Sequence, residues 1–409
     1  MTRRMWVLGG AILGFACGVP APPSSTGGVH VESNAGCPGA IAVVSSDYVS
    51  SNVSVLSTTG HLLSESMISS GSAPPGLTTA LSGDVVLPSV APPSGRLVLV
   101  DRYPNSVLTW VDPATAAVLA QVSVGTGFAS NPHDYLELDA AKAYVPRYES
   151  NPHAGSEPND AGGDLLILDT ERYVVTGSVS LAQPDDGSFL PHPARLLAVN
   201  GEAWVVLERF EQAYADAGDG RIVGVSPETD SVLWSLDLPG VANCGALSLD
   251  AAGERVAVAC SGVLRRADTV ERSAIVLLDA TVEPPVELAR FAVGAELGSS
   301  PSPTLAWASD SILLGATYGD VQQGTSDLAY ALDVTTGSAH ELRDSGGAVV
   351  LGDALCAPAC SDVCFMADAQ ARALTSFNVE GTEIARGHDV AVDPGIGLPP
   401  RALGFLMAK

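Results

Sequence analysis

Two histidines of this 409-residue chain lie in short proline-containing segments, each just ahead of a predicted strand. His133 belongs to 131–134, Asn-Pro-His-Asp, and His192 belongs to 191–193, Pro-His-Pro. Imidazole nitrogen is a common ligand of divalent metals, and two histidines with a carboxylate could hold an ion that polarises a carbonyl group or activates water. The same segments could instead hydrogen bond to neighbouring backbone in a purely structural role. The residues alone leave both interpretations open.

Carboxylate, guanidinium and phenol side chains follow the strands that come next, where a repeated β-fold places its loops on one face. The candidate ligand-binding residues of this face are His133, His192, Glu149, Glu208, Arg102, Tyr103, Tyr148, Arg209 and Tyr318. The chain has no G-x-S-x-G, no H-E-x-x-H and no phosphate-binding glycine loop beside them. The sequence therefore predicts no catalytic residue. The cofactor is unknown, and a divalent metal such as calcium is the one that these side chains suggest.

The elements that must position these residues repeat along the chain. The stretch 95–124 holds three apolar runs separated by short polar turns, which is typical of three antiparallel strands in a meander. The end of the middle strand recurs as TWVD, LILD, VLLD and YALD and in weaker forms. The seven copies end at Ser57, Asp112, Asp169, Ser226, Asp279, Asp333 and Asn378. A period of roughly 50 residues is typical of solenoids and propellers.

Two further runs come before most copies, so that these repeats have four short strands each. Four-stranded repeats arranged radially form a β-propeller, which protects its sheet edges by closing into a ring. The first repeat, 41–68, lacks an innermost strand, whereas the chain ends with an apolar run, 401–408, that has nothing after it to pair with. Placing this run in the first repeat completes the ring. We therefore predict an all-β, seven-bladed β-propeller over 37–409, closed by its C-terminal strand.

Two segments carry a family resemblance. LVLVDRYPNSVLTWVDPATAAVLAQVSVG and KAYVPRYES…GGDLLILDTERYVVTGSVSL resemble YVTN-type β-propeller repeats, in which an (L/A)YV strand precedes a V-x-V-I-D strand, a turn and a T-V-(hydrophobic) strand. The resemblance covers roughly residues 40–409. It implies a fold and no single activity, because propellers include binding proteins, lactonases and dehydrogenase subunits. Calcium-dependent propeller lactonases use Glu, Asn and Asp side chains at the central channel, and those positions cannot be matched one by one here.

The N-terminal residues predict export. A basic start and a short apolar run before small residues resemble a secretory signal peptide over 1–16, and the run is too short for a permanent membrane helix. Cys17 comes next and resembles the lipidation site of a bacterial lipoprotein. Ordinary cleavage nearby, with Cys17 lost or unmodified, is the alternative. Residues 17–36 are rich in Pro, Ser and Gly, which predicts a flexible tether.

The other six cysteines fit an oxidising compartment. An even number of cysteines in an exported chain favours three disulfides. Cys244 and Cys260 stand at the start of one strand and the end of the next in a predicted hairpin, so we pair them. The remaining four are Cys37, Cys356, Cys360 and Cys364. They would cluster if the last blade packs beside the first, and they could form two disulfides or bind zinc.

Composition restricts the partners. Only 20 Lys and Arg accompany 46 Asp and Glu, for a net charge of −26, so nucleic-acid binding is disfavoured. We expect a monomeric cell-envelope lipoprotein, in the periplasm or on the outer-membrane surface, with the membrane as partner through its lipid anchor. Its expected role is a binding or scaffolding module for a protein or glycan. The alternative is a metal-dependent, lactonase-like hydrolase with its site at the channel mouth; enzymatic activity is left open and binding is favoured. A periplasmic oxidoreductase subunit is a third, weaker hypothesis.

Overall fold

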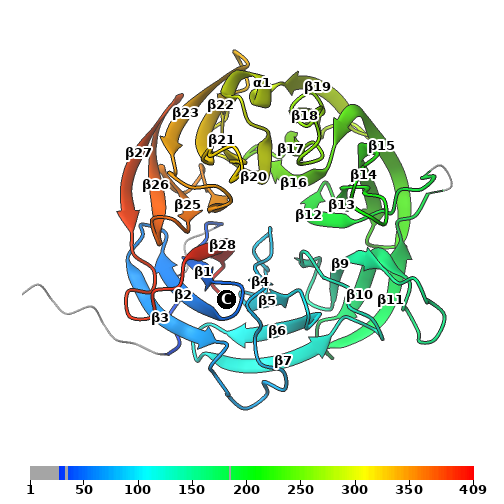
Figure 1. Ribbon diagram of the computed structural model, residues 1–409. Coiled ribbons are helices and arrows are strands. Elements are labelled where there is room, and N and C mark those ends of the chain that lie inside the picture. Colours follow the sequence, from blue (N-terminus) through cyan, green and yellow to red (C-terminus); the bar gives the residue numbers. More distant parts are fainter. Residues whose placement is uncertain (1–26, 33–35, 184–185) are drawn as a thin grey trace, which may run out of the picture.

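Seven antiparallel sheets of four strands each stand radially around a central axis (Figure 1). This computed structural model describes residues 27–32, 36–183 and 186–409. From the axis outward, blade 1 contains β28 (Pro400–Leu406), β1 (Ala40–Ser46), β2 (Ser51–Ser57) and β3 (Leu62–Ser69); blade 2 contains β4 (Val85–Val86), β5 (Leu97–Asp101), β6 (Val107–Asp112) and β7 (Ala117–Ser123); blade 3 contains β8 (Leu136–Glu137), β9 (Lys142–Ser150), β10 (Gly162–Asp169) and β11 (Val174–Ser180). Blade 4 contains β12 (Pro193–Val199), β13 (Glu202–Leu207), β14 (Asp219–Ser226) and β15 (Ser231–Ala242); blade 5 contains β16 (Cys244–Leu249), β17 (Arg255–Ser261), β18 (Ser273–Asp279) and β19 (Val286–Phe291). Blade 6 contains β20 (Pro301–Trp307), β21 (Ile312–Thr317), β22 (Leu328–Asp333) and β23 (Ser338–Asp344); blade 7 contains β24 (Leu351–Leu355), β25 (Val363–Asp368), β26 (Ala373–Glu380) and β27 (Glu383–Val390).

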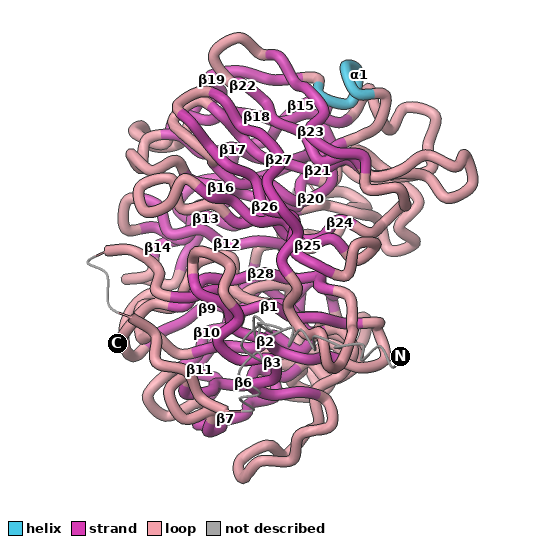
Figure 2. The backbone as a smooth tube through the Cα atoms, turned by 90° about the vertical axis from the view of Figure 1, so that its left-hand side faces the viewer, coloured by secondary structure: helices cyan, strands magenta, loops and turns pink. Residues whose placement is uncertain are grey.

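The apolar core lies between neighbouring blades. The third strands, such as β6 and β18, are buried on both faces because each blade packs against two neighbours, and this explains their continuous Val and Leu runs. Outermost strands such as β7 alternate between exposed and half-buried positions. Six of the seven predicted strand ends are confirmed, and the seventh, Asn378, lies two residues before the end of β26. Figure 2 shows strands and loops almost throughout, with the short helix α1 (Val293–Leu297) ahead of blade 6.

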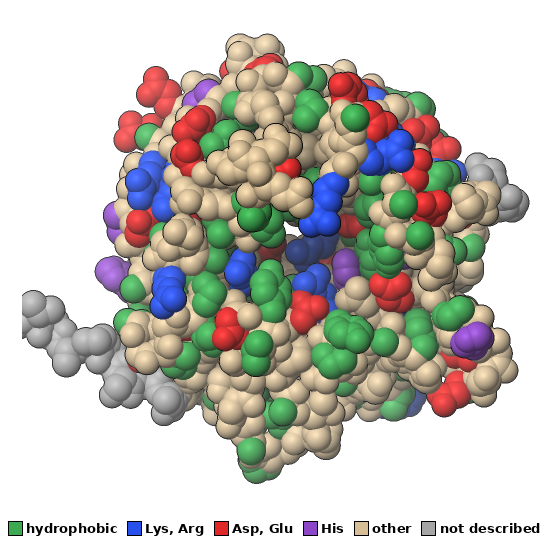
Figure 3. Space-filling model, in the orientation of Figure 1, with side chains coloured by type: hydrophobic (Ala, Val, Ile, Leu, Met, Phe, Trp, Pro, Cys, Tyr) green, Lys and Arg blue, Asp and Glu red, His purple; other side chains and the backbone are tan. Residues whose placement is uncertain are grey.

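The predicted ring closure is confirmed. The C-terminal strand β28 pairs with β1 from Ala40 opposite Leu406 to Ser45 opposite Pro400, and so supplies the innermost strand of blade 1. The first and last strands thereby lie in one sheet, and blade 1 meets blade 7 through a shared apolar cluster. The axis of the ring stays open, and Figure 3 shows it as a hollow at the centre of one face.

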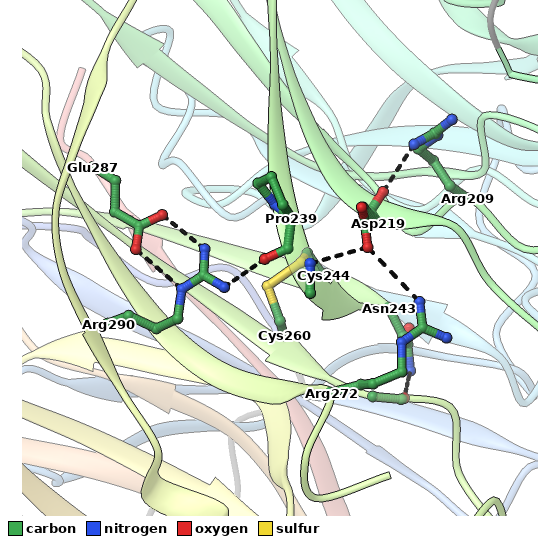
Figure 4. Close-up of a disulfide and its surroundings, with 11 residues drawn as sticks. Arg209, Asp219, Pro239, Asn243, Cys244, Cys260, Arg272, Glu287 and Arg290 are labelled. Atoms are coloured by element: carbon green, nitrogen blue, oxygen red, sulfur yellow. Dashed lines mark hydrogen bonds and ion pairs between the residues drawn. A yellow bond between two sulfur atoms is a disulfide. The ribbon is translucent and has the colours of Figure 1, made fainter. Parts of the chain in front are cut away.

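All six predicted disulfide cysteines are paired. The predicted Cys244–Cys260 bond joins directly opposite residues of β16 and β17 (Figure 4). Gly220 of β14 leaves room for it, since a Cβ there would lie 2.2 Å from the Cys244 Sγ. The other two bonds are Cys356–Cys364 and Cys37–Cys360. The second of these ties the chain ahead of β1 to blade 7, and the pairing excludes the alternative zinc site.

The predicted signal peptide and Cys17 lie outside the described residues. Of the predicted tether, residues 27–32 and 36 are described, and Val29 and Val31 pack against blades 1 and 2. Val29 is only 7% exposed, and its N–H donates to the Pro113 carbonyl at 2.7 Å. The packed part of the chain thus begins before residue 37. No helix in the described ranges has the length and apolar character of a membrane span.

Candidate functional site

One backbone hydrogen bond recurs in every blade at the same end of the channel. A residue at the C-terminal end of the second strand donates its N–H to a carbonyl at the start of the innermost strand, at 2.8–3.2 Å. The seven donor residues, here called the donor ring, are Ser46, Arg102, Tyr148, Glu208, Ser261, Tyr318 and Ala369. The matching acceptors are Pro399, Asp84, Asn131, His192, Asn243, Ser300 and Val350. The donor ring therefore surrounds one mouth of the channel at structurally equivalent positions.

Four of the predicted ligand-binding residues belong to this donor ring: Arg102, Tyr148, Glu208 and Tyr318. A cavity of about 260 Å³ at the channel mouth is lined by Arg102, Glu208 and Tyr318, and Tyr148 is joined to it by its hydrogen bond to Glu208. The innermost strands contribute the residues two positions beyond the acceptors, namely Arg401, Val86, His133, Ala194, Gly245, Ser302 and Gly352. Blades 4 to 7 carry small residues at this level, which leaves open space in front of His133 and Arg401.

Among the acidic residues that line the cavity, Glu208 is the one whose pKa is shifted. The Tyr148 hydroxyl donates to its Oε2 at 2.5 Å, and a Cβ on Gly245 would lie 2.9 Å from its Oε1. Burial raises the pKa of Glu208 to about 7, against the opposing effects of the Tyr148 hydrogen bond and of the Arg102 and Arg195 charges. Glu208 can therefore both accept and release a proton near neutral pH.

The Tyr148 ring contacts both predicted histidines, and the two differ in their surroundings. The His133 ring stacks on Tyr148 at 4.1 Å between centroids, and it faces the cavity. Burial and the nearby charges of Arg102 and Arg195 hold the pKa of His133 well below 6.5, so that its imidazole is neutral at pH 7. His192 is fully buried, with Nδ1 3.0 Å from the Tyr148 carbonyl oxygen. Its pKa is lowered by burial.

His133 and His192 do not occupy equivalent positions of their blades, although each lies in a proline-containing segment ahead of a strand. The recurring backbone bond makes His192 equivalent to Asn131, and His133 equivalent to Ala194. The reason is that the segment entering blade 3 is offset by two residues from the segment entering blade 4. His133 thus points toward the channel, whereas His192 packs between Tyr148 and Tyr214.

The side chains do not fit the predicted divalent metal. The Tyr148 ring contacts both histidine rings, at 4.1 and 4.6 Å between centroids. Among the residues that the structure describes, no three His, Cys, Asp or Glu side chains are grouped as metal ligands. We therefore derive no chemistry from a metal at the predicted His133–His192 pair.

Three arginines and three carboxyl groups line the cavity, and two of the arginines are paired with two of the acids. Arg102 binds Asp84 through Nε at 3.0 Å, and Arg195 lies 3.4 Å from Asp353. Arg401 has no carboxylate partner among the described residues; its Nη1 donates to the Val349 carbonyl and its guanidinium lies over the Tyr48 ring. Figure 3 shows basic side chains gathered around the central hollow of this otherwise acidic protein. Such a mouth favours an anionic group.

Of the other predicted residues, Tyr103 and Glu149 lie beside the cavity, and Arg209 lies away from it. Tyr103, 63% exposed, and Glu149 line an adjoining hollow of about 480 Å³ that shares Asp84 and Arg102 with the cavity. The Tyr214 hydroxyl donates to Glu149 at 2.7 Å. Arg209 is not brought to the mouth. It is buried in an ion pair with Asp186, 3.1 Å away.

The inner edges of the blades supply the residues that sequence reasoning missed: Arg195, Asp353 and Arg401 of the innermost strands, and Asp84 directly ahead of β4. Arg195 and Asp353 also border a second, largely apolar cavity of about 410 Å³ toward the other mouth, so their ion pair marks the boundary between the two. The sequence signal that could have identified these residues was their position in the predicted strands. Arg195 and Arg401 stand at the starts of predicted innermost strands, and such residues face the axis.

Comparison with known proteins supports the fold described above. No family model matches this chain, and no curated protein sequence matches it. Among solved structures, the periplasmic gluconolactonase of Pseudomonas aeruginosa is similar at a TM-score of 0.59 and 13% identity, over 90% of this chain and 99% of that one. A candidate 6-phosphogluconolactonase from Bacteroides fragilis has a TM-score of 0.55 at 10% identity, over 90% and 97%. A functionally unknown protein from Desulfotomaculum acetoxidans has a TM-score of 0.52 at 13% identity, over 90% and 99%. At these identities the likeness establishes a seven-bladed β-propeller and leaves the activity open.

Proposed function

We propose that this protein binds a small organic anion at the mouth of its central channel. The observation that carries the proposal is the grouping of Arg102, Arg195 and Arg401 around one cavity in a chain of net charge −26. Arg401 has no acidic partner among the described residues, and Glu208 is only partly ionised near pH 7. Guanidinium groups suit carboxylates because they present several N–H donors in one plane. The volume of about 260 Å³ suits a ligand of few atoms, such as a sugar acid.

Calorimetric titration with gluconate tests this proposal, with sorbitol as its uncharged counterpart. We expect gluconate binding in the wild type and a loss of about tenfold or more in Arg401→Gln, because a hydrogen bond to a charged group contributes about 1.5–3 kcal/mol. Arg172→Gln removes a guanidinium whose side chain is 80% exposed on blade 3, and it should bind as the wild type does. Equal affinity for gluconate and sorbitol, or equal losses in both variants, would contradict the proposal.

Lactone hydrolysis is the second candidate, favoured by the pKa of Glu208. An ionised Glu208 could take a proton from water as the hydroxyl adds to a lactone carbonyl, and the arginines could stabilise the resulting oxyanion. The ring C–O bond then breaks, the departing oxygen takes up a proton, and the product is a hydroxy acid of the class proposed above. The gluconolactonase among the similar structures makes sugar lactones a reasonable first set of substrates. This mechanism uses no metal, unlike the metal-dependent hydrolase that is the alternative hypothesis from the sequence.

We also propose that the protein works in the cell envelope, held there by a lipid on Cys17. Its three disulfides support an oxidising compartment. Cys17→Ser should move the protein from the membrane fraction to the soluble fraction, because the thioether-linked lipid would be lost. An unchanged membrane fraction in the Cys17→Ser variant would contradict lipid anchoring. A protein or glycan partner and the monomeric state stay predictions.

A further inference from the structure

The second cavity of the channel, here called the apolar chamber, lies toward the mouth opposite the donor ring and has a volume of about 410 Å³. Its lining residues come from every blade except blade 3, and they include Leu249, Trp307 and Leu355. Among the described residues that line it, Arg195 and Asp353 are the only charged ones. Small-molecule sites are cavities of about 300–1,000 Å³ with mostly apolar walls and a few polar groups. The apolar chamber therefore has the size and the lining of a site for an amphipathic molecule.

A connection of blade 2 closes the chamber on the side of blade 3. Residues 87–96, between β4 and β5, reach toward the axis (Figure 1). The Ser89 N–H donates to the fully buried Asp134 carboxylate at 2.8 Å, and Val90 packs against the core clusters of blades 3 to 5. These contacts fix the wall before any ligand binds, and a preformed site avoids the entropic cost of ordering it.

Arg195 is the polar end of the chamber, at its boundary with the anion cavity. Its side chain is 19% exposed, and its guanidinium makes one hydrogen bond within the described ranges, from Nη2 to the Asp353 Oδ1 at 3.4 Å. The other Asp353 oxygen accepts the Leu403 N–H at 3.2 Å. A guanidinium has several N–H donors in one plane, so most of those of Arg195 have no protein partner among the described residues. A ligand carboxylate suits them, because it can accept parallel N–H bonds from one guanidinium.

The direction of the innermost strands orders these features along the axis. Each of these strands begins at the donor ring and runs toward the other mouth. Arg195 stands near the start of β12, whereas Leu249 and Trp307 end β16 and β20. The apolar side chains therefore continue from Arg195 toward the second mouth.

We propose that the apolar chamber binds an aliphatic carboxylate, with its carboxylate on Arg195 and its chain extending toward Trp307. Because Asp353 offsets part of the Arg195 charge, burial of the chain supplies most of the affinity. The ligand differs from the sugar acid proposed above, which has no apolar chain. The site shares the Arg195–Asp353 pair with the anion cavity, and it does not depend on the proposed function.

Calorimetric titration of the purified protein with hexanoate, octanoate and decanoate at neutral pH tests the proposal. Each added CH₂ group should tighten binding by about fourfold, because it is buried among apolar side chains. Decanol should bind more weakly than decanoate by about tenfold or more, since it lacks the charged acceptor for Arg195. Acetate, which has no chain to bury, should give no measurable heat.

Two substitutions separate this site from the anion cavity. Leu249→Trp fills part of the chamber and should weaken decanoate binding by about tenfold or more, while gluconate binding is unchanged. Arg401→Gln should do the reverse, because Arg401 lines the anion cavity and not the chamber. Leu233→Trp is the matched control. It places the same side chain at a 48% exposed position of β15, and it should bind both ligands as the wild type does.

Trp307 gives a local signal of occupancy. Decanoate with a bromine at the end of its chain should quench tryptophan fluorescence in the wild type, because bromine quenches an indole ring that it contacts. The quenching should be lost in Trp307→Phe, since the other described tryptophans pack in the cores between blades. This measurement does not require Leu249→Trp to fold.

The proposal is overturned if decanoate does not bind, if its affinity equals that of hexanoate, or if decanol binds equally well. Quenching that persists in Trp307→Phe would place the ligand elsewhere and would also overturn it. Binding of gluconate without decanoate, or of decanoate without gluconate, would show which of the two proposals fails.

Discussion

Removal of residues 400–409 is expected to abolish cooperative folding of the whole ring. The deletion takes away β28, the innermost strand of blade 1, and exposes the pairing edge of β1. Leu403 and Leu406 are buried in two different core clusters, one shared with blade 7 and one with blade 2. Burying a leucine side chain contributes about 1.5–3 kcal/mol, and a domain is stable by about 5–15 kcal/mol in total. The loss of a whole strand is therefore comparable to the entire stability.

Thermal unfolding followed by circular dichroism measures this effect. A deletion of residues 407–409 alone is the matched control, because it leaves β28 intact and removes only the half-buried Met407 and Ala408 and the Lys409–Asp112 ion pair, 3.6 Å long. Exposed ion pairs contribute about 0–1 kcal/mol, so this control should melt close to the wild type. If the longer deletion also melts at the wild-type temperature, β28 is not needed for closure and the ring is held by its other contacts.

The fold could be predicted because its strongest signals are local. A third strand such as β10 is buried on both faces and ends at a turn, so its apolar run and its final Asp169 are visible in the sequence. The closing strand followed from counting, since one blade lacked a strand and one run lacked a partner. The strand β4 has two residues, too few to give a pattern. The helix α1, of five residues with an internal glycine, was missed for the same reason.

The candidate site could be predicted only in part, because its geometry depends on register. Residues that end second strands, such as Arg102 and Glu208, were found because the end of an apolar run is visible. Residues within the innermost strands were missed, since bulges shift their register, as between Pro193 and Leu196 of β12. The same limit applies to cysteines. Cys244–Cys260 is a neighbouring-strand pair, whereas Cys37 and Cys360 are 323 residues apart and meet only because the ring closes.

Glu208→Gln is expected to lower hydrolysis of gluconolactone by about 10²–10⁴-fold if the protein is a lactonase, because general-base catalysis contributes about that much. The wild-type rate should rise with pH through about 7, where Glu208 loses its proton and becomes able to accept one from water. This pH dependence should be absent from the variant. The measurement is the rate of lactone opening between pH 5.5 and 8, corrected for the spontaneous reaction, with Glu171→Gln, at an exposed turn of blade 3, as the control.

The same substitution separates catalysis from folding. The raised pKa means that the folded protein favours the neutral form of Glu208, so this group favours folding most at low pH and its contribution is lost as the pH rises through about 7. Glutamine imitates the neutral form and can still accept the Tyr148 hydrogen bond. The variant should therefore melt at or above the wild-type temperature at pH 8 and should still bind gluconate. A variant that keeps full activity, or a wild-type rate that does not change between pH 6 and 8, would exclude Glu208 as the base. The arginine-lined cavity would then act in binding alone.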